Sequence, residues 1–89
     1  MANIRFQPTP NPNAGKFIAD RNVVDGTASI SFYNPEDAAD HALGAALFEL
    51  EGVVSLFMVD NFVTVSKAAD ASWEKLVPEV QSVMERVLG

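Results

Sequence analysis

His41 is the only histidine in the sequence and the side chain best suited to metal or acid–base chemistry. On a helix, Asp37 would share its face, because the two residues are spaced i, i+4. A stable zinc or iron site usually needs roughly three or four converging ligands. The sequence offers no second histidine, no HExxH motif and no carboxylate-rich calcium loop. We therefore predict no metal site and expect His41 on a solvated helix face, in weak contact with Asp37.

The sequence also lacks the residues and motifs that nucleophilic catalysis and cofactor binding usually require. The chain has no cysteine, so it forms no disulfide or thiolate nucleophile and cannot hold an iron–sulfur cluster on cysteines of its own. The sequence has no GxSxG turn, which would expose a serine nucleophile. Four serines fall inside predicted strands, where a structural role is expected: Ser29, Ser31, Ser55 and Ser66. The five glycines are dispersed rather than gathered in a phosphate loop. The sequence thus predicts no catalytic residue, no cofactor and no enzyme activity.

The chain length, the net charge and the lengths of the apolar stretches exclude further classes of protein. Eighty-nine residues, 48% of them hydrophobic, predict a single domain over residues 1–89. Six Lys and Arg against twelve Asp and Glu give a net charge of −6, with no basic run, which excludes nucleic acid as a partner. The longest apolar stretch, Val53–Val59, is too short for a bilayer of about 30 Å, and the N-terminus has no apolar signal-peptide core. We expect a cytoplasmic protein without membrane contact.

The elements that must position any site follow from periodicity. Alternating or β-branched runs predict strands at residues 3–7, 16–19, 27–33, 53–59 and 62–66. Apolar residues at helical spacing predict one helix from Pro35 to near Leu50 and another from near Trp73 to Leu88. There is no βαβ repeat. This order favours an α+β fold, a mostly antiparallel β-sheet with two α-helices packed on one face.

Local signals predict where the helices begin and end. Asn34 is a typical N-cap, and Pro35 suits the first helical position. Gly52 is free to adopt the left-handed cap after the first helix. Pro78 interrupts the second helical pattern, so it predicts either a kink or a helix that restarts there.

The aromatic residues are predicted to be structural. Asp60 and Asn61 both tolerate the positive φ of a type I′ hairpin turn, and the strands on either side should pair antiparallel. Phe57 and Phe62 flank this hairpin, and we expect them to pack across it in the core. Two further aromatics are expected to be mainly structural: Phe48 and Trp73.

Residues 8–15, with the sequence PTPNPNAG, predict a stiff connection on the surface. Proline fixes φ and cannot donate to a ladder, and asparagine closes turns locally. Exposed loops on a rigid scaffold are where recognition usually resides. Four polar residues of the connection from Thr9 to Lys16 are candidates for partner binding: Thr9, Asn11, Asn13 and Lys16. A purely structural turn between two strands is the alternative.

Several segments together resemble a known family. They are TPNPNAGKF at residues 9–17, LFELEGV at residues 47–53, DNFVTVSK at residues 60–67, and Trp73. This pattern resembles the N-terminal domain of Nfu/NifU-type iron–sulfur cluster scaffold proteins, over nearly the whole chain. The chain departs from that family at Gly15, where an apolar residue is common, and at residues 40–43, where a Ser-Pro-Leu segment enters the first long helix.

The resemblance implies an accessory domain. Full-length family proteins bind the cluster through a CxxC motif in a second domain, and this sequence contains no CxxC motif. The implied role is protein interaction in iron–sulfur cluster assembly or delivery, without ligating the cluster. The implied partners are a CxxC-containing Nfu domain, a cluster scaffold or apo iron–sulfur targets. A small structural or regulatory binding protein unrelated to iron–sulfur traffic is the alternative function.

Overall fold

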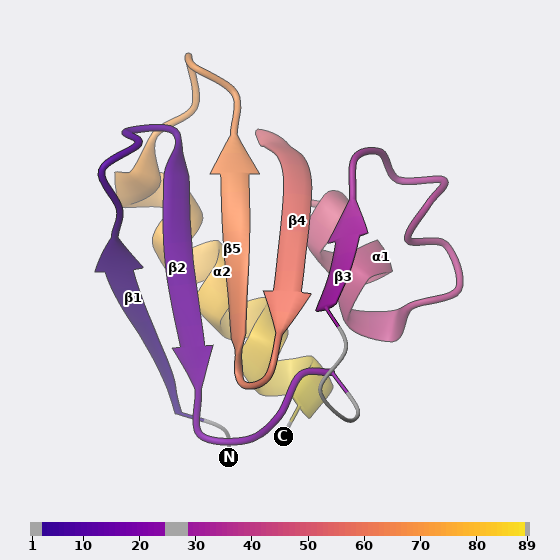
Figure 1. The fold of residues 1–89 in the computed structure, drawn as a ribbon. Coiled ribbons are helices and arrows are strands. Elements are labelled where there is room, and N and C mark those ends of the chain that lie inside the picture. The colour runs from indigo at the N-terminus through magenta and orange to yellow at the C-terminus, as the bar shows by residue number, and fades with distance from the viewer. Residues whose placement is uncertain (1–2, 25–28, 89) are drawn as a thin grey trace.

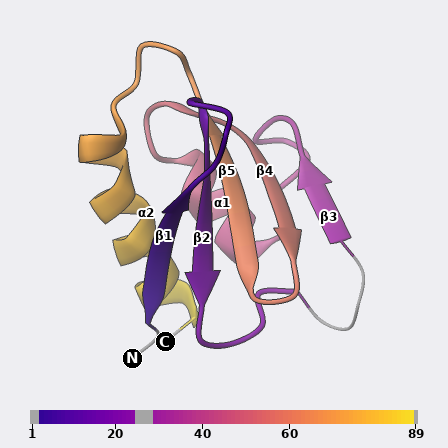
Figure 2. The ribbon, with the colours of Figure 1, turned by 60° about the vertical axis from the view of Figure 1, so that its left-hand side comes forward.

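The computed structural model describes residues 3–24 and 29–88. Its elements in chain order are β1 (Ile4–Pro8), β2 (Ala14–Ala19), β3 (Ser29–Phe32), α1 (Ala42–Phe48), β4 (Val53–Val59), β5 (Phe62–Lys67) and α2 (Trp73–Leu88). The five strands form one sheet in the order β1-β2-β5-β4-β3, and every neighbouring pair is antiparallel. Both helices cover the same face of this sheet (Figure 1; Figure 2). The predicted α+β fold is confirmed.

Side chains alternate along the strands as the sequence predicted, and one set forms the core beneath the helices. In β2 and β5 every second residue is buried, including Phe17, Val63 and Val65, which have no exposed surface. The helices complete the core from the other side with Leu43, Leu47, Leu76, Val80 and Met84. Phe48 is half-buried and packs against this core. The second set of strand side chains points away from the helices.

The strand boundaries differ slightly from the prediction. Pro8 is the last residue of β1, where its missing N–H is tolerated because β1 is an edge strand. β2 begins at Ala14 rather than Lys16, since Ala14 to Ile18 pair with β5. Residues 27–28 of the predicted third strand lie outside the described residues, as do Asp25 and Gly26, whose residue types are typical of a turn.

The predicted start of the first helix at Pro35 is wrong. Asn34 does cap a turn, since its Oδ1 accepts from the Asp37 N–H at 2.9 Å, but residues 35–40 form successive turns closed by i to i−3 bonds. His41 then adopts an extended backbone (φ −108°, ψ 115°), and α1 begins at Ala42. The helix ends at Phe48, so Gly52 is not its cap. Gly52 instead takes its positive φ of 99° in the turn before β4.

The hairpin between β4 and β5 forms as predicted, but its turn is not type I′. Asp60 has φ of 50°, whereas Asn61 does not adopt the positive φ that type I′ requires at both central residues. Asn61 is held by tertiary bonds instead, because its Nδ2 donates to the Ala19 carbonyl at 3.1 Å. The rings of Phe57 and Phe62 do meet across the hairpin, with centroids 6.5 Å apart. They lie on the face away from the helices, so their predicted place in the core is wrong.

α2 (Trp73–Leu88) is one continuous helix that includes Pro78, so of the two predicted alternatives, a kink or a restart at this residue, the restart does not occur. Pro78 is exposed, and the helix buries its opposite stripe against the sheet and α1. The helix is tied at its end to the segment after β2, where Arg21 Nη1 donates to the Leu88 carbonyl at 2.9 Å. Such a cation at a helix C-terminus also suits the helix dipole. No helix among the described residues is long and apolar enough to cross a membrane.

Candidate protein-interaction site

The loop of residues 9–13, between β1 and β2, is ordered by its own polar side chains. The Thr9 hydroxyl lies 3.0 Å from the Asn11 carbonyl oxygen and 2.8 Å from that of Ala14, and it accepts from the Asn11 N–H at 3.2 Å. Asn11 Oδ1 accepts from the Asn13 N–H at 2.9 Å. These are the local side-chain bonds that stabilise turns, so the loop has little conformational freedom left to lose.

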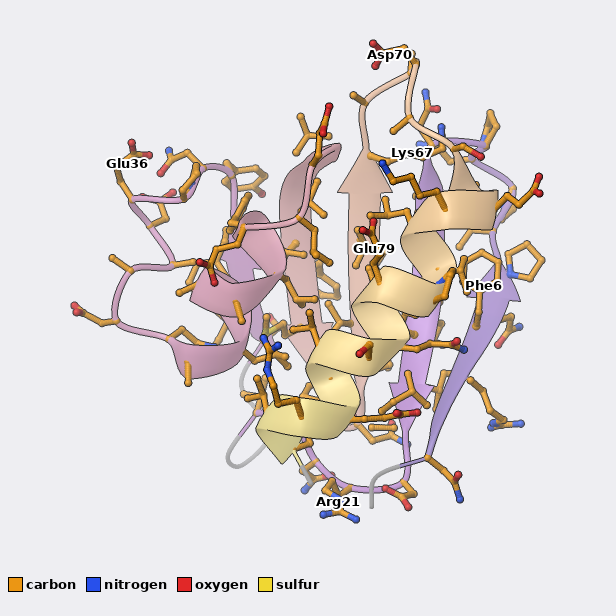
Figure 3. The ribbon with its side chains drawn as sticks, turned by 180° about the vertical axis from the view of Figure 1, so that it is seen from behind. Phe6, Arg21, Glu36, Lys67, Asp70 and Glu79 are labelled. Atoms are coloured by element: carbon orange, nitrogen blue, oxygen red, sulfur yellow. The ribbon has the colours of Figure 1, made fainter. Side chains whose placement is uncertain are left out.

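Two residues far along the chain anchor this loop. The indole Nε1 of Trp73, the first residue of α2, donates to the Pro12 carbonyl at 2.9 Å. The ammonium of Lys67, the last residue of β5, donates to Asn13 Oδ1 at 3.1 Å and to the Ala68 carbonyl at 3.3 Å. Figure 3 shows Lys67 beside the first turn of α2. The loop is therefore fixed to the end of the sheet and the start of α2 at once.

Lys67 is the only buried charged residue among those described, with 8% of its surface exposed. A buried charge is costly unless it is paired or hydrogen-bonded. No carboxylate of the described chain lies within ion-pair distance of it. The Lys67 ammonium is stabilised instead by hydrogen bonds to the two oxygens named above and by the Trp73 ring, whose centroid is 5.7 Å from Nζ. The Lys67 ammonium therefore ties the loop to α2.

An aromatic cluster lies under the loop. The rings of Phe6, Phe17 and Trp73 are mutually tilted, with centroids 5.1 to 6.2 Å apart. Gly15 makes this packing possible, because a Cβ there would come within 2.4 Å of Phe6 Cε1 and 3.0 Å of Trp73 Cη2. At Gly15, where the sequence departs from the family pattern, these two rings fill the space that a side chain would take.

The loop and the aromatic rings form the wall of an open hollow of about 260 Å³. Its lining is mostly apolar and includes Phe6, Pro8, Pro12 and Trp73, with Thr9 and Asn11 at its polar edge. Pro10, Asn11 and Pro12 are exposed. The loop thus presents a rigid proline and asparagine surface beside a small apolar hollow.

Three of the four predicted partner-binding residues lie together in this loop, and the fourth does not. Thr9, Asn11 and Asn13 belong to the bonded turn, whereas Lys16 lies on β2 with its side chain on the sheet face away from the helices. There its Nζ lies 4.1 Å from the centroid of the Phe62 ring. The anchors Lys67 and Trp73 were not predicted as site residues. Both residues belong to the segments that carry the family resemblance, and this membership is the sequence signal that could have pointed to them.

The structure gives His41 a structural role that differs from the prediction. Its Nδ1 accepts from the Gly44 N–H at 3.0 Å, so His41 is the N-cap of α1, and its ring packs on Phe32 at 5.4 Å between centroids. It is half-buried rather than solvated, and a contact with Asp37 is not observed. Across residues 3–24 and 29–88, no three His, Cys, Asp or Glu side chains gather to hold a metal ion.

The fold and the site define a small two-layer α+β domain whose loop between β1 and β2 is anchored to β5 and α2. The chain belongs to the family described as the N-terminal domain of the scaffold protein Nfu/NifU, whose model matches residues 4–89. It is 38% identical to a NifU-like protein of Schizosaccharomyces pombe and 37% identical to the human NFU1 iron-sulfur cluster scaffold homolog, mitochondrial. Each match covers 91% of this chain but 32% of the relative, so the chain spans about a third of these relatives.

Solved structures agree with this assignment. The solution structure of a NifU-like protein from Saccharomyces cerevisiae superposes with a TM-score of 0.85 at 30% identity, covering 97% of this chain and 77% of that one. A crystal structure of a Staphylococcus aureus protein matches with a TM-score of 0.79 at 32% identity, covering 91% of this chain and 96% of that one.

Proposed function

We propose that residues 1–89 form one accessory protein-interaction domain in iron–sulfur cluster assembly or delivery, which does not itself ligate the cluster. Membership of the Nfu/NifU N-terminal family supports the pathway. The lack of any cysteine supports the non-ligating role, because biological clusters are held mainly by thiolates. The domain then contributes by recognising proteins that carry or receive the cluster.

The observation that carries this proposal is the preordered loop. Its turn bonds and its two anchors hold residues 9–13 before any partner arrives, which lowers the ordering cost of association. Asn11 and Asn13 use their side-chain oxygens internally, while their NH₂ groups make no hydrogen bond to the described residues. These NH₂ groups are the donors that a partner would meet.

The partners we propose are a CxxC-containing Nfu domain, a cluster scaffold or apo iron–sulfur targets. Asn11→Asp/Asn13→Asp keeps each Oδ1 acceptor and removes each NH₂ donor, so the loop geometry should survive. Asn3→Asp/Asn22→Asp is the matched control, because both residues are exposed and the charge change is equal. Titration calorimetry with a CxxC Nfu domain or an apo target should show weaker binding for the loop variant only. Equal affinities for the two variants would remove the loop from the binding site.

The non-ligating role has a separate test. After anaerobic incubation with iron and sulfide, the purified domain should show no visible charge-transfer absorbance. A stoichiometric cluster that co-purifies with the domain would contradict this part of the proposal while leaving the loop interaction untouched.

We also propose that the domain is not catalytic and acts in the cytoplasm. The first statement is supported by the structural use of His41 as a helix cap. The second is a prediction from sequence that cell fractionation would test, since the human, Arabidopsis and Drosophila relatives are named as mitochondrial. Affinity capture that recovers only proteins without iron–sulfur chemistry would favour the alternative of an unrelated regulatory protein.

A further inference from the structure

The sheet face opposite the helices is a second exposed surface. It is formed by side chains of the strands and not by the loop of residues 9–13. Figure 1 is seen from this side, and no described element covers it. The pairing registers align its side chains in two rows across all five strands. One row is Arg5, Ile18, Phe62, Val59 and Ser29, and the next is Gln7, Lys16, Thr64, Phe57 and Ser31. We call these ten residues the open sheet face.

The centre of the open sheet face is apolar and its borders are polar. Ile18, Phe57, Val59 and Phe62 are neighbours in the two rows, and Phe57 keeps 39% of its surface exposed. Polar residues of the two edge strands flank this centre, with Gln7 on one side and serines on the other. An apolar core inside a polar rim is the anatomy of a protein–protein interface.

The charge of the open sheet face is opposite to that of the whole protein. The chain has twice as many acids as bases, yet the only charged residues in the described strands are the cations Arg5, Lys16 and Lys67. Lys67 is buried on the other face, so the open sheet face carries two positive charges and no negative one. Neither Arg5 nor Lys16 has a carboxylate partner among the described residues.

One acid at the rim of the open sheet face already has a cationic partner. Asp20, just beyond β2, is paired with Arg21 at 3.2 Å. Desolvation acts to raise the pKa of Asp20, but hydrogen bonds from the Asn3 backbone and from Arg21 outweigh it, and the pKa lies below its usual value. A hollow of about 460 Å³ begins beside Arg5 and Ile18 at this end, which extends the surface that a partner could occupy.

We propose that the open sheet face is a docking surface for a protein segment that presents acidic side chains next to apolar ones. The apolar centre would bury the partner's apolar residues, and Arg5 and Lys16 would select its carboxylates. Lys16 is already positioned over the Phe62 ring, so a carboxylate reaching it would lie against the apolar centre. This goes beyond the loop interaction, because it names a different face and the chemistry of its partner.

Other occupants fit this face less well. Two cations are too few for nucleic acid or an anionic membrane, and the net charge of −6 repels both. A second copy stacked face to face would bring the cations Arg5 and Lys16 of both chains into one interface, which costs energy through like-charge contact.

The test uses a soluble amphipathic peptide with glutamates on its polar face and leucines on its apolar face. Titrated into the isotopically labelled protein, it should shift backbone amides of β2, β5 and β4 along the two rows. Arg5→Glu/Lys16→Glu should weaken binding about tenfold, which is ~1.4 kcal/mol. Lys75→Glu/Arg86→Glu makes the same charge change at exposed positions of α2 and should bind like the original protein.

Further measurements distinguish the proposed acidic partner from other occupants of the open sheet face. Phe57→Ser should weaken binding, whereas Val54→Ser, at a residue 49% exposed outside the two rows, should not. The same peptide with lysines replacing its glutamates should not bind. Equal binding of the lysine peptide, shifts confined to other surfaces, or no shift with the glutamate peptide would each overturn the proposal. So would self-association that Phe57→Ser abolishes, or binding to anionic vesicles. Loop variants should leave this binding unchanged.

Discussion

The indole Nε1 of Trp73 donates a 2.9 Å hydrogen bond to the carbonyl of Pro12, joining the first residue of α2 to a turn 61 positions earlier in the chain. Next to it, Lys67 binds Asn13 of the same turn at 3.1 Å. Three of the four segments that carry the family resemblance, residues 9–17, residues 60–67 and Trp73, therefore meet at this loop. Their combination holds one loop in one conformation.

Removing the indole donor should loosen the loop without unfolding the domain. Trp73→Phe keeps an aromatic ring against Phe6 but leaves the Pro12 carbonyl without its donor. We expect the free energy of unfolding to fall by about 1 kcal/mol from the lost hydrogen bond, and more if the smaller ring packs poorly. Denaturant unfolding measures this, and faster amide exchange should be confined to the loop and its neighbours. Unchanged exchange of the Ala14 N–H would show that the Trp73 bond does not hold the loop.

Lys67 and Asn13 should be energetically coupled. Lys67→Met keeps the apolar stem and removes the ammonium, and Asn13→Ala removes its acceptor. Because both changes break the same bond, the double variant should be less destabilised than the sum of the single variants, by about 0.5–1.5 kcal/mol. A double-mutant cycle by urea unfolding measures this coupling, with Lys75→Met as an exposed control. Strict additivity would show that the buried ammonium is stabilised elsewhere.

Gly15→Ala should destabilise the domain even though it removes a flexible residue. Its Cβ would meet Phe6 Cε1 at 2.4 Å, and such overpacking costs about 1–3 kcal/mol. That exceeds the ~0.4–1 kcal/mol gained by stiffening the unfolded chain. Phe6→Leu in the same chain should relieve part of the clash, so the two changes should couple favourably in thermal unfolding. A more stable Gly15→Ala variant would mean that Phe6 moves aside at little cost.

The cap of α1 is tested by comparing two replacements of His41. His41→Ala and His41→Ser both lose the ring contact with Phe32, but serine can still accept from the N–H groups of the first turn. We expect His41→Ser to be more stable than His41→Ala by about 1 kcal/mol. The measurement is the difference in free energy of unfolding between these two variants. If they are equally stable, the cap adds nothing and His41 acts through its ring alone.

The sequence by itself determined the sheet, the second helix and the class of the domain. Alternation in β1 and β3 and the β-branched runs of β4 and β5 are local patterns that favour strands, and the lack of cysteine needs no structure to interpret. Pairing of β4 with β5 also follows from adjacency along the chain. The prediction of a stiff surface connection over residues 8–15 was local too, because prolines and asparagines act on their own backbone.

Tertiary structure decided where α1 begins, which face holds Phe57 and Phe62, and what fixes the loop. Asn34 and Pro35 carry a strong local helix signal, but the contacts of His41 with Gly44 and Phe32 place the helix start at Ala42 instead. Alternation along a strand shows which residues share a face of the sheet. It does not show which of the two faces the helices will cover. Lys67 and Trp73 reach the loop across more than fifty residues of sequence, a relationship that exists only once the sheet order and α2 bring them together.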